Sequence, residues 1–278
     1  MSYKTILVHL NDKRRLESVL GPAVHLARRN NAHLIGLHAY INVPMPPIGL
    51  AYGAQPPSSV MSAQREEAEA IGAAFAKVAT NQSFVAEWRS LKVPPIELAG
   101  VVIDHGRAAD LIVAGQADPD WEVSPLVDFP ERLALQSGRP VLVVPYAGRF
   151  GEVGRNVVIA WKAGRESARA VFDALPILQT ADKVHILEIK HQGDAIDGLA
   201  PDMTIAASLG RHGIKLTVQT SVAADISVGD DILSRLSDLD ADLLVMGAYA
   251  HSRMRELVFG GVTRHIFRHM TVPTLFSH

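Results

Sequence analysis

Short apolar runs alternate with longer stretches of helical periodicity along the chain. Runs such as Ile6-Leu7-Val8 and Val157-Val158-Ile159 are apolar at consecutive positions, which is typical of strands covered by helices on both faces. Strands are predicted at residues 4–10, 33–40, 84–91, 110–115, 140–144, 156–161, 183–189, 215–221, 242–246 and 273–276. Helices are predicted at residues 14–30, 58–80, 95–106, 126–137, 165–178, 199–212, 228–239 and 260–269. This alternation predicts an α/β fold with right-handed crossovers and doubly wound parallel sheets.

The sequence repeats itself once. The opening YKTILVHLN is matched by GRNVVIAWK near the middle, AADLIVAG is matched by DADLLVMG, and RPVLVVP is matched by VPTLFSH. A repeat of this length indicates a duplicated domain rather than a solenoid unit. We therefore expect two tandem domains, residues 1–147 and 154–278, each with five strands. The Gly-rich and polar segment YAGRFGEVGRN is the predicted linker.

One segment, residues 41–59, interrupts this rhythm. Its five prolines rule out a regular helix or strand. Two interpretations remain open: a loop packed on its own domain, or a lid or partner surface. The packed loop is favoured because long loops are only sometimes functional.

Composition narrows the class of protein. Lys and Arg total 27 and Asp and Glu total 29, a net charge of −2, which argues against a partner such as nucleic acid or a membrane surface. The absence of cysteine excludes disulfides and thiol chemistry. The chain shows neither a signal-peptide pattern nor an apolar run near the ~18 residues that a membrane span needs. We expect a cytoplasmic protein.

The segment MGAYAHSRMRELVFGGVTRHIF, residues 246–267, is the clearest candidate for a binding site. An apolar strand is followed by a polar loop with cationic side chains, and then by Gly260-Gly261, which are expected to open the last helix. Glycine allows the backbone to approach a ligand closely, and amides at the start of a helix attract anions. The segment therefore predicts a phosphate site.

Several stretches in combination resemble the universal stress protein family in its tandem form. They are VVIAW and ESARAV at the opening of the second half, DADLLVMGAYAHSR, and the ending GGVTRHIFRHMTVPTLFSH. The resemblance implies Rossmann-like five-stranded domains and a role in the stress response, with ATP bound by some members. It also implies that the final strands, RPVLVVP and PTLFS, pair to form an intramolecular pseudo-dimer. A further homodimer is compatible with this arrangement.

Nucleotide-binding members carry an acid after the first strand and a Gly-x2-Gly-x9-Gly-Ser/Thr loop after the fourth. In the second half Lys162 replaces the acid, Ala250 and Arg253 replace the loop glycines, and Gly260-Gly261 remain. We expect the helix-start amides and nearby cations to hold a nucleotide or another anion. The alternative is structural: glycines that permit close packing, and surface ion pairs of little energetic weight. The predicted binding residues are Ala160, Trp161, Lys162, Met246, Gly247, His251, Ser252, Arg253, Gly260, Gly261, Val262 and Thr263.

The first half departs further from the nucleotide-binding pattern. Asn11 and Asp12 stand near the acid position, and no glycine lies between Gly115 and Gly138. Acidic side chains in the loop after the fourth strand would repel phosphate. They are Asp118, Asp120, Glu122 and Asp128. We expect a degenerate site that does not bind ATP in the family manner.

No catalytic residue and no metal site are predicted. The nucleophile elbow, the Walker loop and the GxGxxG motif are absent from the sequence, so we expect a weak ATPase activity at most. His265 and His269 have a chelating spacing but lack an HExxH motif, and surface histidines are favoured. We expect a stress-response protein that requires no cofactor and acts by binding ATP, another adenine nucleotide or phosphate. The alternative is an interaction scaffold that uses residues 41–59.

Overall fold

The computed structural model describes residues 2–41, 58–80, 82–94, 97–121, 124–191, 203–223, 226–248 and 256–278. The first half contains β1 (Thr5–His9), α1 (Leu16–Asn30), β2 (His33–Ile41), α3 (Ser58–Ala79), β3 (Ala86–Val93), α4 (Leu98–Gly106), β4 (Leu111–Gly115), α5 (Ser124–Val127), α6 (Pro130–Gln136) and β5 (Val141–Val144). The second half contains β6 (Asn156–Trp161), α7 (Arg165–Asp173), α8 (Leu175–Leu178), β7 (Lys183–His191), α9 (Met203–Arg211), β8 (Leu216–Ala223), α10 (Val228–Asp238), β9 (Leu243–Gly247), α11 (Glu256–His269) and β10 (Thr274–Ser277). The predicted α/β alternation is confirmed.

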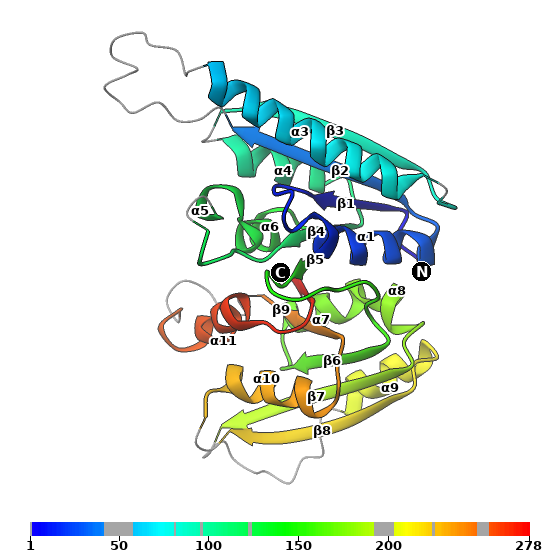
Figure 1. The fold of residues 1–278 in the computed structure, drawn as a ribbon. Helices are drawn as coiled ribbons and strands as arrows, with labels where there is room; N and C mark the ends of the chain where they lie inside the picture. Colours follow the sequence, from blue (N-terminus) through cyan, green and yellow to red (C-terminus); the bar gives the residue numbers. More distant parts are fainter. Residues whose placement is uncertain are drawn as a thin grey trace.

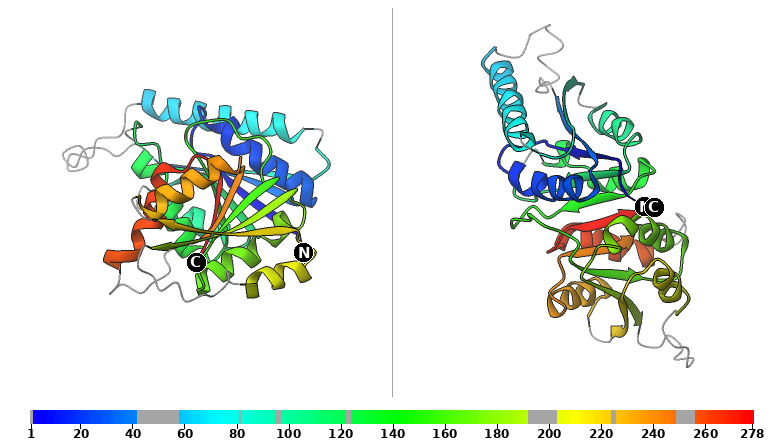
Figure 2. Two further views of the ribbon diagram at one scale, coloured as in Figure 1. Left: turned by 90° about the horizontal axis from the view of Figure 1, so that it is seen from below. Right: turned by 90° about the vertical axis from the view of Figure 1, so that its right-hand side faces the viewer.

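The two halves share one ten-stranded sheet in the order β3-β2-β1-β4-β5-β10-β9-β6-β7-β8. Strands within each half are parallel, and the halves join where β5 runs antiparallel to β10, with Leu142 opposite Leu275. Figures 1 and 2 show the two halves stacked across this junction. The junction confirms the predicted pairing of the final strands and covers two edges that would otherwise be open.

Helices cover both faces of the sheet because the buried strands are apolar on both sides. One face packs against α1, α3, α7, α8 and α9, and the other against α4, α6, α10 and α11. Phe276 of β10 is fully buried and its ring stacks on Phe267 of α11 at 4.1 Å between centroids. The core therefore runs through the junction between the halves without a break.

Three predicted helices differ from the observed ones. The helix expected at residues 126–137 is divided, since α6 starts at Pro130, which cannot donate a backbone hydrogen bond within a helix. The helix expected at residues 165–178 is divided in the same way just before Pro176. The last helix begins at Glu256, earlier than expected. Most of the proline-rich segment, residues 42–57, lies outside the described residues.

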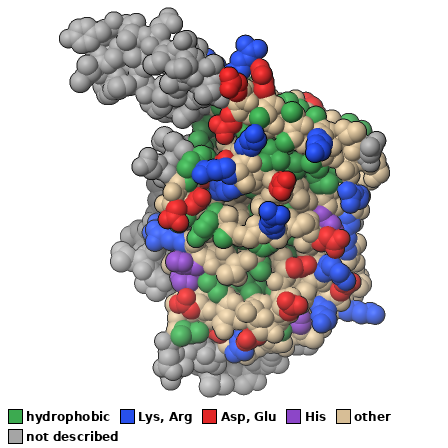
Figure 3. Space-filling view, viewed as in Figure 1, with side chains coloured by type: hydrophobic (Ala, Val, Ile, Leu, Met, Phe, Trp, Pro, Cys, Tyr) green, Lys and Arg blue, Asp and Glu red, His purple; other side chains and the backbone are tan. Residues whose placement is uncertain are grey.

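The surface gives a mixed electrostatic picture. On the face drawn in Figure 3, acidic and basic side chains are interspersed and neither sign forms a continuous field. Among the helices that the structure describes, none has the length and apolar character needed to cross a membrane.

The Phe276 ring gives a direct test of the junction. Replacing Phe276 by Ala leaves a cavity at the β5–β10 boundary and is expected to lower the free energy of unfolding by about 3–5 kcal/mol. Urea denaturation of the full chain measures this change. Phe172, which is 43% exposed, is the matched control, and Phe172→Ala is expected to cost far less. Equal losses in the two variants would show that the junction is not part of the core.

Candidate functional site

The second half brings five of the predicted binding residues together where its strand order reverses. β6 lies between β7 and β9, and Ala160 is paired with Met246 near the carboxyl ends of the strands. Trp161 is buried, and Lys162, directly after β6, is exposed. In open α/β sheets, ligands bind outside the carboxyl ends of the strands at such a reversal. The geometry therefore places this group at the position where the fold is able to accept a ligand.

Gly247 allows α7 to approach the end of β9. A Cβ atom at Gly247 would lie 2.6 Å from the carbonyl carbon of Glu166 and from the backbone nitrogen of Ser167. α7 begins after Gly164 and its N-terminus has no side-chain cap. The Glu166 carboxylate is buried and pairs with Arg165 at 3.1 Å. A negative side chain in the first turn already complements the positive end of this helix.

The glycine pair near the C-terminus does not open a helix, and this part of the prediction is wrong. α11 begins at Glu256, so Gly260-Gly261 lie in its second turn. Only the first four amides of a helix lack intrahelical partners, and the amides of Gly260, Gly261 and Thr263 lie beyond them. Val262 is half-buried and Thr263 is buried. These residues cannot supply the expected row of free helix-start amides.

The other three predicted residues, His251, Ser252 and Arg253, lie outside the described residues. The elements that precede and follow them in the chain are β9 and α11, both in the second half. The structure thus gathers Ala160, Trp161, Lys162, Met246 and Gly247, and it places Gly260–Thr263 on the helix that follows.

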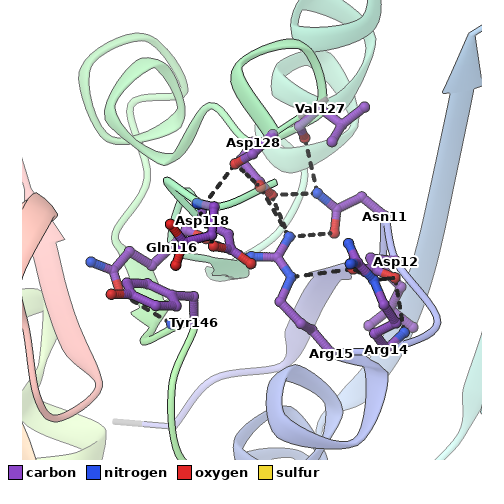
Figure 4. A network of polar contacts seen from close by, with 12 residues as sticks. Asn11, Asp12, Arg14, Arg15, Gln116, Asp118, Val127, Asp128 and Tyr146 are labelled. Atoms are coloured by element: carbon purple, nitrogen blue, oxygen red, sulfur yellow. Dashed lines mark hydrogen bonds and ion pairs between the residues drawn. The ribbon is translucent and has the colours of Figure 1, made fainter. Parts of the chain in front are cut away.

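The equivalent place in the first half is filled by an ion pair. One nitrogen of Arg15, Nη2, donates to both carboxylate oxygens of Asp128 at 2.9 Å, and Nη1 donates to the carbonyl of Gln116 at 2.7 Å (Figure 4). Arg15 is 8% exposed and Asp128 is 7% exposed. A buried charge is strongly destabilising unless an opposite charge pairs with it. This cluster therefore occupies the reversal between β1 and β4 with the chain's own groups.

Further side chains complete this cluster. Asn11 donates to the carbonyl of Val127 at 3.1 Å and also to Asp128, while Ser124 donates to Asp128 at 2.6 Å. The ring of Trp121 lies 5.2 Å from the guanidinium carbon of Arg15. Asp128 was expected to repel phosphate from an acidic loop. Its charge is instead neutralised by Arg15, so the loop is held closed by attraction.

Asp12 has a local role in the first half. Its carboxylate accepts a hydrogen bond from the backbone nitrogen of Arg14 at 2.8 Å and pairs with the Arg14 side chain at 2.9 Å. Arg15 Nε lies 3.6 Å away. Asp12 is thus used to fix the turn before α1 rather than facing an open site.

His9, at the end of β1, is buried beside the same cluster. Its ring lies 5.3 Å from that of Phe129, and Nε2 is buried without a hydrogen-bond partner among the described residues. Burial lowers the pKa of His9 to about 3, with smaller contributions in the same direction from His38 and Arg15. His9 is therefore neutral in the folded protein at ordinary pH.

The histidine pair on α11 is engaged with α10. His265 Nε2 lies 2.9 Å from a carboxylate oxygen of Asp230, and the rings of His265 and His269 are 4.6 Å apart. Within the described ranges, no three metal-ligating side chains gather into a group that could hold an ion.

The comparisons with known proteins identify a family domain in the second half of the chain. The model of the universal stress protein family matches residues 155–278. The second half of the chain, residues 155–278, is thus a universal stress protein domain. The match covers the half that contains β6 to β10.

Relatives extend the likeness to the whole fold. A universal stress protein of Synechocystis sp. is 32% identical over 146 residues, 52% of this chain and 49% of that protein, so the chain spans about half the length of this curated relative. A universal stress protein from Archaeoglobus fulgidus DSM 4304 has a TM-score of 0.73 at 17% identity, over 98% of this chain and 95% of that one. A structure from Pseudomonas aeruginosa UCBPP-PA14 has a TM-score of 0.56 at 16% identity, over 99% and 93%. At these identities the two structures support the fold alone.

The most developed polar site of the chain was not found from the sequence. Arg15 and Asp128 are 113 residues apart, and Arg15 stands in an ordinary charged run, NDKRR. Gln116 is a single polar residue after a strand, which carries no motif. Only the acidic loop could be recognised in the sequence, and its negative charge was interpreted without the arginine that pairs with it.

Gly247 provides the first test of the second-half site. A Cβ here forces α7 away from β9, and Gly247→Ala is expected to lower the free energy of unfolding by about 1–3 kcal/mol. Gly261 is the control, since nothing lies within 4 Å of its added Cβ. In the helical position of Gly261, Ala is expected to stabilise by about 0.5–1 kcal/mol. Chemical denaturation measures both, and a neutral Gly247→Ala would contradict the close approach.

His9 predicts a pH dependence of stability. Its folded-state pKa lies below the unfolded value of 6.5, so the unfolded state binds more protons between the two values and stability falls as the pH drops below 6.5. The loss is about 1.4 kcal/mol per pH unit. Between pH 7 and pH 5, His9→Leu should therefore lose about 2 kcal/mol less stability than the native chain. Parallel pH curves in denaturant titrations would show that His9 is not buried in its neutral form.

Proposed function

We propose that this protein binds an adenine nucleotide or another phosphate-bearing anion in its second half, at the reversal between β6 and β9. One contrast between the halves carries the proposal. The residue before the first helix is Arg15 in the first half and Gly164 in the second, and the residue after the fourth strand is Gln116 in one and Ala248 in the other. The Arg15 side chain that fills the first reversal has no equivalent at Gly164, whereas Gln116 contributes only its backbone carbonyl there.

The charges around the second reversal support an anionic ligand. Lys162 follows β6 and Arg165 opens α7, and both are exposed. Cations beside the start of a helix form charge-assisted hydrogen bonds with phosphate oxygens. Glu166 opposes this attraction, but its charge is already paired with Arg165. Phosphate recognition then depends on Lys162 and on the backbone, and it does not use the row of amides first assigned to Gly260–Thr263.

The first half has a different part in this proposal. Its Arg15–Asp128 pair takes the position of a ligand, so we assign one binding site to each chain. The protein acts in the cytoplasm through binding rather than through a chemical step, in keeping with a stress-response family. A further homodimer remains compatible with the fold, because β3 and β8 are the outer strands of the sheet.

Lys162→Ala tests the proposed site. We expect calorimetric titration with ATP to show binding to the native chain and about tenfold weaker binding to the variant, because one charge-assisted hydrogen bond is lost. Lys183→Ala is the control: this exposed lysine starts β7, at the opposite end of the strands, and its loss should leave the affinity unchanged.

Parallel titrations with AMP and inorganic phosphate distinguish nucleotide from simple anion recognition. If the native chain shows no heat with any of the three ligands at millimolar concentration, the binding proposal is refuted and the scaffold hypothesis gains weight. If both lysine variants lose affinity equally, the ligand is held by general charge attraction rather than at the β6–β9 reversal.

A further inference from the structure

Gln116 lies at the boundary of the two halves with every polar group of its side chain engaged. Nε2 donates to the carbonyls of Phe267 at 2.8 Å and Arg268 at 3.0 Å. Oε1 accepts from the backbone nitrogen of Tyr146 at 3.0 Å, and the Gln116 backbone nitrogen donates to Val144. The residue is 0% exposed. A fully buried amide with this many partners has one well-defined position.

The two carbonyls that Gln116 reaches belong to the last turn of α11. The last four carbonyls of a helix have no partner within the helix, and they need caps when they are buried. Here a side chain from the first half supplies the cap for a helix of the second. The equivalent position after β9 is Ala248, which has no side-chain donor to return the contact. The connection therefore runs in one direction, from the first half to α11.

The same residue is tied to the ion-pair cluster of the first half. The Gln116 carbonyl accepts the 2.7 Å hydrogen bond from Arg15, and Arg15 in turn holds Asp128 (Figure 4). A continuous chain of hydrogen bonds thus leads from Asp128 through Arg15 and Gln116 to the end of α11. That helix is about 21 Å long at 1.5 Å per residue. Its second turn carries Gly260-Gly261, two of the residues that the sequence analysis assigned to the candidate ligand site.

We propose that Gln116 is a positioning residue that couples the ion-pair cluster of the first half to α11, so that the closed first half sets the position of this helix. The coupling to α11 stands on the contacts alone. Its consequence for ligand affinity rests on the function proposed above. The first half then acts as a built-in regulator: any opening of the Arg15–Asp128 pair loosens the end of α11.

Hydrogen exchange of the full chain without ligand tests the coupling. Gln116→Leu removes the cap, and we expect the amides of α11 to exchange at least tenfold faster. Gln136→Leu is the matched control, because Gln136 is exposed on α6 of the same half. Protection of α10, which also belongs to the second half, serves as the internal reference and is expected to stay unchanged. Equal α11 exchange in the native chain and in Gln116→Leu overturns the proposal.

A second variant separates coupling from a local cap. In the part of the chain that the structure describes, hydrogen bonds connect Asp128 to α11 through Arg15 and Gln116. Asp128→Asn is therefore expected to speed the exchange of the α11 amides from a distance. It should add nothing further in the Gln116→Leu background, because the two changes act in series. Asp120→Asn, an exposed change of the same charge in the same loop, is the control. If Asp128→Asn does not fold, Arg15→Lys applies the same test. An α11 that responds to Gln116→Leu but not to the ion-pair variants overturns the coupling.

Calorimetry then connects the coupling to binding. We expect Gln116→Leu to weaken ATP binding roughly fivefold or more, with Gln136→Leu unchanged. A native chain that binds none of ATP, AMP and inorganic phosphate refutes the proposed function and leaves the exchange result to decide the coupling. A native chain that binds ATP with the same affinity as Gln116→Leu, although α11 exchanges faster, shows that α11 does not transmit the coupling to the ligand and overturns the regulatory proposal.

Discussion

The buried Arg15–Asp128 pair imposes the main constraint on this molecule. Two opposite charges lie in an almost dry site, and either one without the other would be strongly destabilising. Their hydrogen bonds involve the turn before α1, the end of β4 and the segment around α5, which are the three parts that surround the strand reversal of the first half. In the function proposed here, a reversal closed in this way does not hold a ligand phosphate, and the two halves of a duplicated chain become unequal.

The shared sheet connects the closed reversal of the first half to the second half. Because β5 pairs with β10, the end of β4 lies beside the end of α11, and Gln116 spans the gap with two hydrogen bonds. In a chain whose halves were joined only by a linker, closure of one site would have no structural path to the other. Here the strands of the junction, the stacked rings of Phe267 and Phe276 and the Gln116 cap place the last helix against the first half.

The sequence predicted the fold well because periodicity and repetition are local or pairwise features. All ten strands were expected within a few residues of their positions, and the β5–β10 pairing followed from the family resemblance. The helix bounds failed where Pro130 and Pro176 divide a continuous periodic pattern. The start of α11 failed because Gly260-Gly261 resemble a helix opening in sequence, whereas the helix continues through them.

The site was predicted only in part, for a physical reason. Ala160, Trp161, Lys162, Met246 and Gly247 follow from strand ends, which the sequence locates. The Arg15–Asp128 pair and the Gln116 cap depend on side chains brought together from more than 100 residues apart. No spacing rule marks such contacts in a single sequence. The acidic loop was recognised, but its charge could be interpreted only when its cationic partner was in view.

The asymmetry between the halves is the central claim, and ligand-dependent hydrogen exchange tests it most directly. The full chain is compared with and without saturating ATP. The account predicts added protection in peptides that cover residues 160–167 and the segment from residue 246 through α11, with none in residues 9–16 or 116–128. Added protection in residues 9–16 and 116–128 would show that the first half also opens to the nucleotide, and would contradict the claim that its own ion pair closes it.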